Sequence, residues 1–245
     1  MSLALLTQYS FLFTFIAFCA ATLYFIMERD SLPVEYRNTA TISACYLGIA
    51  AINYFYMVQL VPRDGTFDTV LNFPTELRYI DWLLTTPLML IKFPALLAGV
   101  SNRMLFVLLI VADVIMIVAG YAGEAIYKRG GSTDMILAYF GVGCLAFMFI
   151  LYLLYSVVSQ AQQEVLGPIS QGLDMMKKFI LIGWSIYPLL FILIVISPSG
   201  ELKVWRELLY NFADAFNKIG FAIVTVAAAR AVARDRELKA DMMRL

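Results

Sequence analysis

The chain has 245 residues, of which 62% are hydrophobic and 15% are charged, and its formal net charge is zero. An ordinary soluble domain is about half apolar and a quarter charged, so this composition indicates an integral membrane protein and gives no reason to expect a nucleic-acid partner. The chain lacks histidine, which excludes histidine metal sites, a serine–histidine triad and a histidine proton switch. Its three cysteines fit no metal or redox spacing, so no metal is expected.

Seven apolar segments are long enough to cross a bilayer, whose core requires about 20 residues of helix. They occupy residues 8–27, 39–60, 76–97, 102–121, 134–159, 175–197 and 204–232. The first is too long for a cleaved signal and has no basic stretch before it, so it is predicted to be a span. Residues 67–74 could form a short hairpin, and 160–171 are interpreted as a polar connection. We expect one domain over residues 1–245, an all-α bundle of seven transmembrane helices.

Lysine and arginine set the expected orientation, because cytoplasmic loops carry an excess of both. Counted together with the adjoining segment ends, the odd-numbered connections and the C-terminal tail contain 11 of them, whereas the even-numbered connections contain 5. The N-terminus is therefore predicted to lie outside and the C-terminus in the cytoplasm, in a multi-pass protein of the cell (inner) membrane. Residues 230–244 are interpreted as a short positive-inside tail, with a docking tail as the alternative.

Two ionisable residues share one face of the last apolar segment. Lys218 lies near its middle, and Asp214 lies one helical turn earlier. A charged amine at that depth costs at least about 2.5 kcal/mol on insertion scales, so it usually marks a functional site with a partner. Lysines of this kind can form Schiff bases with carbonyl compounds.

The third apolar segment carries a second polar stripe. Arg78 precedes Asp81 by three residues and Thr85 follows it by four, so the three share a face. Lys92 lies on nearly the same face, about 16 Å further along the helix. If Lys218 carried a protonated imine, Asp81 and Asp214 could serve as its counterions and Arg78 could keep them ionised. Asp81 could then accept the proton on the outer side, and Lys92 could return one from the inner side.

Other interpretations of these charges remain open at this point. Lys92 lies close to a helix end, from which its side chain could extend to the lipid headgroups. Arg78 could anchor the helix at the membrane interface. Asp113 is interpreted as a protonated or hydrogen-bonded packing residue. Glu207 is interpreted as a solvated residue at the outer end, with proton release as the alternative.

Aromatic residues next to a proline suggest the wall of a binding cavity. Trp184 and Tyr187 are three residues apart and precede Pro188, which would kink the sixth segment. Trp82 could form the opposite wall. Such aromatics more often serve in packing, but two aromatic walls beside a buried amine favour a flat, conjugated ligand.

Three strings of residues carry a resemblance to a known family. They are RYIDWLLTTP at 78–87, WSIYP at 184–188 and DAFNK at 214–218. With them the chain resembles a microbial (type I) rhodopsin, a seven-helix retinal protein, over essentially all seven spans. The string YNFAD at 210–214 and the short outer connections resemble bacterial proteorhodopsin-like proton pumps.

The resemblance implies all-trans retinal bound through an imine to Lys218. It implies that Asp81 is the primary counterion and proton acceptor, that Asp214 is the second counterion and that Arg78 lies beneath them.

An apolar residue at the colour-tuning position, Met89, implies green absorption. Phe140 occupies a place where carotenoid-binding relatives have glycine, which implies no carotenoid antenna. The implied retinal pocket consists of Trp82, Thr86, Met89, Met116, Gly120, Trp184, Tyr187, Pro188 and Phe191.

Two residues depart from the common pattern of that family. Most outward proton pumps have an acidic residue where this chain has Lys92, although a small bacterial group has lysine there and is associated with pumping. Such a donor must be neutral for part of the cycle. Asn53 stands where proteorhodopsin-like proteins usually have a histidine paired with the acceptor. Asn53 could form a hydrogen bond with Asp81 but could not share its proton.

The function that the resemblance implies is a light-driven outward proton pump, which is an ion transporter and not an enzyme. Its partners would be membrane lipid, protons and further copies of the chain in a trimer or pentamer. Asp81 argues against an inward chloride pump, and the sodium-pump residue set is missing. A slow-cycling sensory rhodopsin that signals to a partner protein is the alternative, and a seven-helix protein without chromophore is a remote third.

Overall fold

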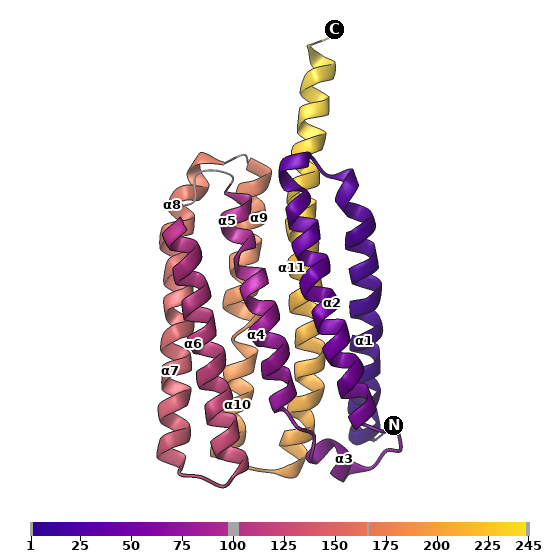
Figure 1. Cartoon of the computed structure of the whole chain (residues 1–245), viewed down its shortest axis with the longest axis vertical. Helices are drawn as coiled ribbons and strands as arrows, with labels where there is room; N and C mark the ends of the chain where they lie inside the picture. Colours follow the sequence, from indigo (N-terminus) through magenta and orange to yellow (C-terminus); the bar gives the residue numbers. More distant parts are fainter. Residues whose placement is uncertain (1, 98–102, 166, 244–245) are drawn as a thin grey trace.

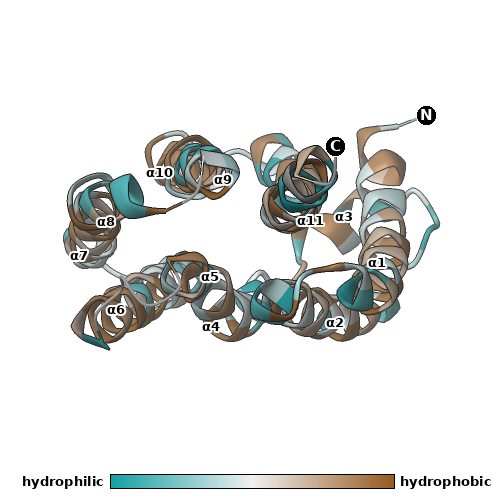
Figure 2. Ribbon diagram, turned by 90° about the horizontal axis from the view of Figure 1, so that it is seen from above, coloured by the Kyte–Doolittle hydropathy of each residue, from teal (hydrophilic) through white to brown (hydrophobic). Residues whose placement is uncertain are grey.

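The computed structural model describes residues 2–97, 103–165 and 167–243, and its regular elements in these ranges are helices. Seen from above, the long helices form an elongated ring (Figure 2). One long side contains α1 (Leu3–Glu28), α2 (Arg37–Leu60), α4 (Glu76–Leu90) with α5 (Lys92–Leu96), and α6 (Arg103–Lys128). The other contains α7 (Thr133–Tyr152), α9 (Gly167–Lys178) with α10 (Ile186–Ile196), and α11 (Gly200–Met242). Contacts of α1 with α11 and of α6 with α7 close the ring.

Short elements connect or extend these helices. Two π-helical turns interrupt long helices: η3 (Leu153–Val158) follows α7, and η5 (Phe179–Gly183) lies between α9 and α10. The remaining elements are α3 (Phe67–Leu71), α8 (Ser159–Ala161) and the 3₁₀ turns η1 (Arg29–Ser31), η2 (Val34–Tyr36) and η4 (Gln162–Glu164). π-helical turns are uncommon and occur frequently at functional sites, so their positions bear on the site.

Six helical segments within the described ranges are long and apolar enough to cross a membrane. The pair α4 and α5 falls short because it is interrupted at Ile91 and carries several charges. Pro94 lacks the N–H that would continue the ladder to the Leu90 carbonyl, which accounts for an interruption at this point. The pair nevertheless packs between α2 and α6 as a member of the ring.

Several expectations about connections were wrong. Residues 67–74 contain the helix α3 and not a hairpin, and the polar connection expected at 160–171 is helical again from Gly167. The last helix is much longer than expected: α11 continues to Met242 and projects beyond the other helices (Figure 1). The predicted start of the fourth segment at 102 and the end of the tail at 244 lie outside the described residues.

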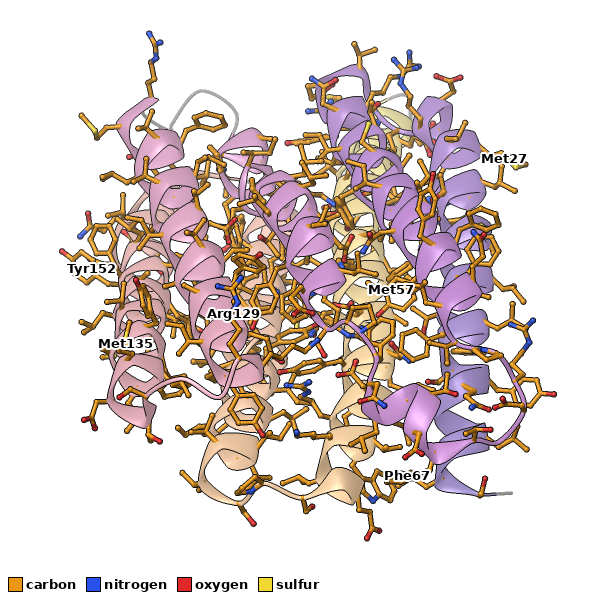
Figure 3. The ribbon with its side chains drawn as sticks, turned by 60° about the horizontal axis from the view of Figure 1, so that its bottom comes forward. Met27, Met57, Phe67, Arg129, Met135 and Tyr152 are labelled. Carbon is orange, nitrogen blue, oxygen red and sulfur yellow. The ribbon has the colours of Figure 1, made fainter. Side chains whose placement is uncertain are left out.

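The bundle has an apolar outside and a partly polar inside. Met27, Met135 and Tyr152 lie on its flanks and point away from it (Figure 3), and each is more than half exposed. By contrast, Arg78, Asp81, Lys92, Asp214 and Lys218 are all at most 2% exposed. This distribution is typical of a membrane protein, in which ionisable side chains face the bundle interior.

A glycine sets the closest approach between α9 and α11. A Cβ atom added to Gly172 would lie 2.6 Å from Cβ of Ala228. Gly141, in the middle of α7, has no such neighbour within 4 Å. The two glycines therefore form a matched pair, because alanine in a helix gains the same propensity at both positions but meets another helix only at Gly172.

We expect Gly172→Ala to lower the stability of the bundle by about 1–2 kcal/mol, since overpacking outweighs the gain in helix propensity. Gly141→Ala should leave stability unchanged or raise it slightly. Thermal loss of the helical circular dichroism signal in detergent measures both. Equal melting temperatures for the two variants would contradict the close contact between α9 and α11.

Candidate functional site

A stripe of buried polar residues runs along one face of α11. Its members are spaced by three, four or seven residues, which keeps them on one side of a helix. They are Glu207, Asn211, Asp214, Lys218 and Thr225, each at most 2% exposed. Because α11 packs against α1, α2 and α9, this face points into the ring, where the charged residues of α4 and α5 also lie.

The amine of Lys218 lies between two carboxylates. Its Nζ atom forms an ion pair with Oδ2 of Asp81 on α4 and lies 3.4 Å from Oδ1 of Asp214, one turn away on its own helix. The hydroxyl of Tyr46 donates to the backbone carbonyl of Lys218 at 2.9 Å, which ties this turn of α11 to α2. The structure thus brings together Lys218 and the two carboxylates that were predicted to be its counterions.

The two carboxylates have different surroundings. Asp214 accepts three hydrogen bonds, from Nε1 of Trp82 at 3.0 Å and from the hydroxyls of Tyr187 and Tyr54, both at 2.8 Å. Among the described residues, the Asp81 carboxylate accepts a hydrogen bond only from the Lys218 amine, through Oδ2, and its Oδ1 atom has no hydrogen-bond partner. Hydrogen bonds to a carboxylate stabilise its charged form. Asp214 is therefore held as an anion by several groups, whereas Asp81 depends on the amine.

Arg78 is fully buried and occupies the space beyond Asp214. Its Nε atom donates to Glu207 at 2.9 Å, its Nη2 atom to Asn211 at 2.6 Å and its Nη1 atom to the hydroxyl of Tyr54 at 2.8 Å. The same Nη1 atom lies 3.8 Å from Asp214. The interpretation of Arg78 as an interfacial anchor is wrong, because no part of its side chain reaches the surface.

The expectation of a solvated Glu207 is also wrong. Glu207 is 2% exposed and pairs with Arg206 as well as with Arg78. Arg206 in turn forms a buried ion pair with Glu124 of α6, at 3.0 Å. This second pair was not predicted from the sequence, because the fourth segment was ended at 121 and Arg206, near the start of the seventh segment, was counted with the connection before it. The spacing of Glu207 with Asn211, Asp214 and Lys218 was the signal that could have placed it inside.

Lys92 lies on the opposite side of Lys218 from this network. It is fully buried at the start of α5, and its Nζ atom donates to the hydroxyls of Ser43 (2.6 Å) and Thr225. Rings of Tyr46 and Phe221 lie 5.5 Å from the amine, and no described carboxylate pairs with it. The interpretation in which Lys92 extends to the headgroups is wrong, because the amine is enclosed between α2 and α11.

Three predicted polar residues do not reach the carboxylates of Asp81 and Asp214. The side-chain amide of Asn53 donates to the backbone carbonyl of Leu77 at 3.1 Å and not to Asp81. Leu77 precedes Asp81 by one helical turn, so the short amide side chain is satisfied before it reaches the carboxylate. The hydroxyl of Thr85 bonds to the backbone carbonyl of Asp81 at 2.9 Å. Thr86 lies 2.8 Å from Asp113, which is therefore hydrogen-bonded, as one of the two interpretations expected.

A mostly apolar cavity adjoins the Lys218 amine. All nine residues that the resemblance placed in the retinal pocket line it together with Lys218: Trp82, Thr86, Met89, Met116, Gly120, Trp184, Tyr187, Pro188 and Phe191. Sequence analysis missed several other wall residues, among them Tyr79, Ile117, Gly143, Cys144 and Phe147. Phe140 also lines the cavity and stacks on Phe191, with ring centroids 5.9 Å apart.

This donor set fits retinal. The cavity is lined by one primary amine, that of Lys218, and by the carboxylate of Asp214, which lies 3.4 Å from it. Aromatic side chains form much of the remaining wall. Trp82 and Tyr187, from different helices, have ring centroids only 4.8 Å apart. Gly120 leaves room for the ring of Tyr79, because a Cβ atom at position 120 would lie 2.9 Å from that ring. A buried amine in an apolar, aromatic cavity suits an aldehyde with a flat conjugated chain.

Comparisons with known proteins agree with this geometry. The family of bacteriorhodopsin-like proteins matches residues 5–232. The green-light absorbing proteorhodopsin of Gamma-proteobacterium EBAC31A08 is 32% identical over 221 residues, which cover 89% of this chain and 84% of the relative. Bacteriorhodopsin-II of Haloarcula marismortui is 33% identical over 217 residues, covering 86% and 84%.

Solved structures give the same result. The crystal structure of Exiguobacterium sibiricum rhodopsin is 46% identical and superposes with a TM-score of 0.88, covering 94% of this chain and 98% of that one. The match over nearly the whole length and the cavity beside a buried lysine leave one conclusion. The chain belongs to the bacteriorhodopsin-like family of microbial rhodopsins, multi-pass membrane proteins that carry covalently bound retinal.

Proposed function

We propose that this rhodopsin is a light-driven outward proton pump in which retinal is attached to Lys218. The observation that carries the proposal is the asymmetry around the Lys218 amine. On one side lies Asp81, whose Oδ1 atom has no hydrogen-bond partner among the described residues. On the other side lies the buried amine of Lys92 of α5, which contacts Thr225 of α11. The relatives named above include a proteorhodopsin and a bacteriorhodopsin, which supports a transport function.

The direction of transport follows from the proposed topology. We assign the pair α4 and α5 as one more span, third in chain order, because it packs in the ring with the six apolar spans. The excess of basic residues then places the N-terminus outside and the C-terminus inside the cell. With this orientation Arg78 and Glu207 lie toward the outside, and Lys92 lies toward the cytoplasm.

Bound retinal supplies the absorption of light and a light-driven change at the Lys218 nitrogen. The protein supplies the proton acceptor, which we assign to Asp81, because Asp214 already receives three hydrogen bonds that favour its anionic form. Arg78 lies 3.8 Å from Asp214 and keeps a positive charge on the outer side of the pair. Arg78 in turn forms an ion pair with Glu207 at 2.9 Å, which links Asp214 to the outer network.

Lys92 is the proposed donor that returns a proton to the Lys218 nitrogen. Its amine contacts Thr225, which follows Lys218 by seven residues, a rise of about 10 Å along α11. The amine is surrounded by two hydroxyls and two aromatic rings and by no described carboxylate. Loss of its proton therefore breaks no ion pair, which suits a group that must be neutral for part of each cycle.

The expected transport is tested with illuminated vesicles or cells that contain the protein. Light should cause outward acidification that a protonophore abolishes. Asp81→Asn should shift the visible band to longer wavelength and abolish transport, because the acceptor and a counterion are removed together. Asp134→Asn, at an exposed acid of α7, is the matched control and should transport normally. An unchanged absorption spectrum in Asp81→Asn would remove Asp81 from the proposed role.

The donor role is tested by flash spectroscopy on Lys92→Ala. Return of the proton to the Lys218 nitrogen should slow at least about tenfold, since a positioned acid or base usually contributes more than that. The exposed Lys178→Ala is the control and should keep the rate of the unmodified protein. An unaltered rate in Lys92→Ala excludes Lys92 as the donor. Recovery over many seconds without acidification in the unmodified protein would support the sensory alternative.

A further inference from the structure

The neighbour of the proposed attachment lysine contacts an irregular turn in another helix. Asn217 is 2% exposed, and its Nδ2 atom donates to the backbone carbonyl of Gly183 at 2.9 Å. Gly183 is the last residue of the π-helical turn η5 and directly precedes Trp184, which lines the cavity. The side chain of Asn217 thus links α11, next to Lys218, to the backbone of the sixth span at the cavity wall.

The Gly183 carbonyl needs this partner because the helix does not supply one. In a regular α-helix it would accept from the N–H of Tyr187, four residues later. Here the N–H of Tyr187 bonds to the Trp184 carbonyl instead, at 3.2 Å. The next residue, Pro188, has no N–H to offer. A buried backbone carbonyl without a partner is costly, so Asn217 satisfies a group that the turn leaves free.

The contact is also a close steric fit. A Cβ atom added to Gly183 would lie 1.9 Å from Oδ1 and 2.8 Å from Cγ of Asn217. Every other residue type at position 183 would therefore displace the amide. The Oδ1 atom has no hydrogen-bond partner among the described residues, so the Nδ2 atom and this fit determine the orientation of the amide.

The same amide reaches the counterion region. Its Nδ2 atom lies 3.3 Å from the hydroxyl of Tyr187, and that hydroxyl donates to Asp214. Asn217 consequently contacts three parts of the site: the backbone before Trp184, the Tyr187 hydroxyl and, through its own backbone, Lys218. None of these contacts involves Asp81.

We propose that Asn217 is a positioning residue that clamps the π-helical turn of the sixth span against the lysine-bearing helix. The clamp holds the Trp184 wall in place and sets the rate at which the illuminated protein returns to its dark state. This inference rests on the proposed attachment of retinal to Lys218. The predicted interaction between positions 183 and 217, however, belongs to the protein alone and is testable without retinal.

The first test is a double-mutant cycle on the retinal-free protein, with thermal unfolding as the readout. Gly183→Ala should lower the melting temperature strongly when Asn217 is present, because the new methyl group displaces the amide. In an Asn217→Ala background the same substitution should cost little, since the obstructing group is gone. Gly141→Ala serves as the control and should have the same small effect in both backgrounds. If Gly183→Ala is equally harmful in both, the clamp does not exist.

The second test uses the retinal-bound protein. Asn217→Ala should keep the visible band close to its normal position, because Asp81 and Asp214 retain their contacts with Lys218. Its recovery after a flash should slow about fivefold, the effect of one lost hydrogen bond. Asn217→Ser keeps a donor, should restore part of the rate, and replaces the alanine variant if that one does not fold. Normal recovery in Asn217→Ala and an unshifted band together overturn the inference.

These outcomes separate the clamp from the function on which it rests. If the unmodified protein forms no visible band with retinal, the proposed function fails, and the unfolding cycle still decides whether the clamp exists. If a band forms and the cycle shows simple additivity, the clamp fails while the proposed function stands.

Discussion

The structure depends on one constraint, which is that a primary amine is buried in the middle of an apolar bundle. An isolated charge at that depth is costly, so Lys218 requires partners that come from more than one helix. Asp214 supplies one from the same helix and Asp81 supplies the other from α4. Because these partners must meet at one point, they fix how α4 and α11 lie relative to each other, and the apolar cavity forms beside that point.

The surroundings of the amine differ along the axis of the bundle. Toward the proposed outer side, two arginines and two glutamates form a chain of ion pairs, in the order Glu124, Arg206, Glu207 and Arg78. Toward the proposed inner side, the amine of Lys92 is held by hydroxyl groups, and no described carboxylate pairs with it. Charge is thus balanced on one side and isolated on the other. In the proposed pump, a proton therefore leaves toward the ion-paired outer side and is replaced from the side of Lys92.

Sequence alone sufficed for features that depend on one helix at a time. Apolar length gave the positions of the six long apolar helical segments, and the pairing of Asp214 with Lys218 followed from a spacing of four. The strings around Asp81 and Trp184 led to the pocket through family resemblance.

Features that depend on how helices meet were missed or misjudged. The side chain of Lys92 lies inside the bundle at the break between α4 and α5. The pairing of Glu124 with Arg206 requires α6 and α11 to extend further than their apolar stretches. The contact of Asn53 with a backbone carbonyl likewise depends on the relative height of α2 and α4.

The most direct test of the account is chemical identification of the lysine that carries the chromophore. The protein is loaded with retinal, the linkage is reduced with borohydride, and peptides are analysed by mass spectrometry. The account predicts a retinyl group on the peptide that contains Lys218 and on no other. A retinyl group on Lys92, a second fully buried lysine, would contradict it. So would an unmodified Lys218 in a protein that has formed its visible band.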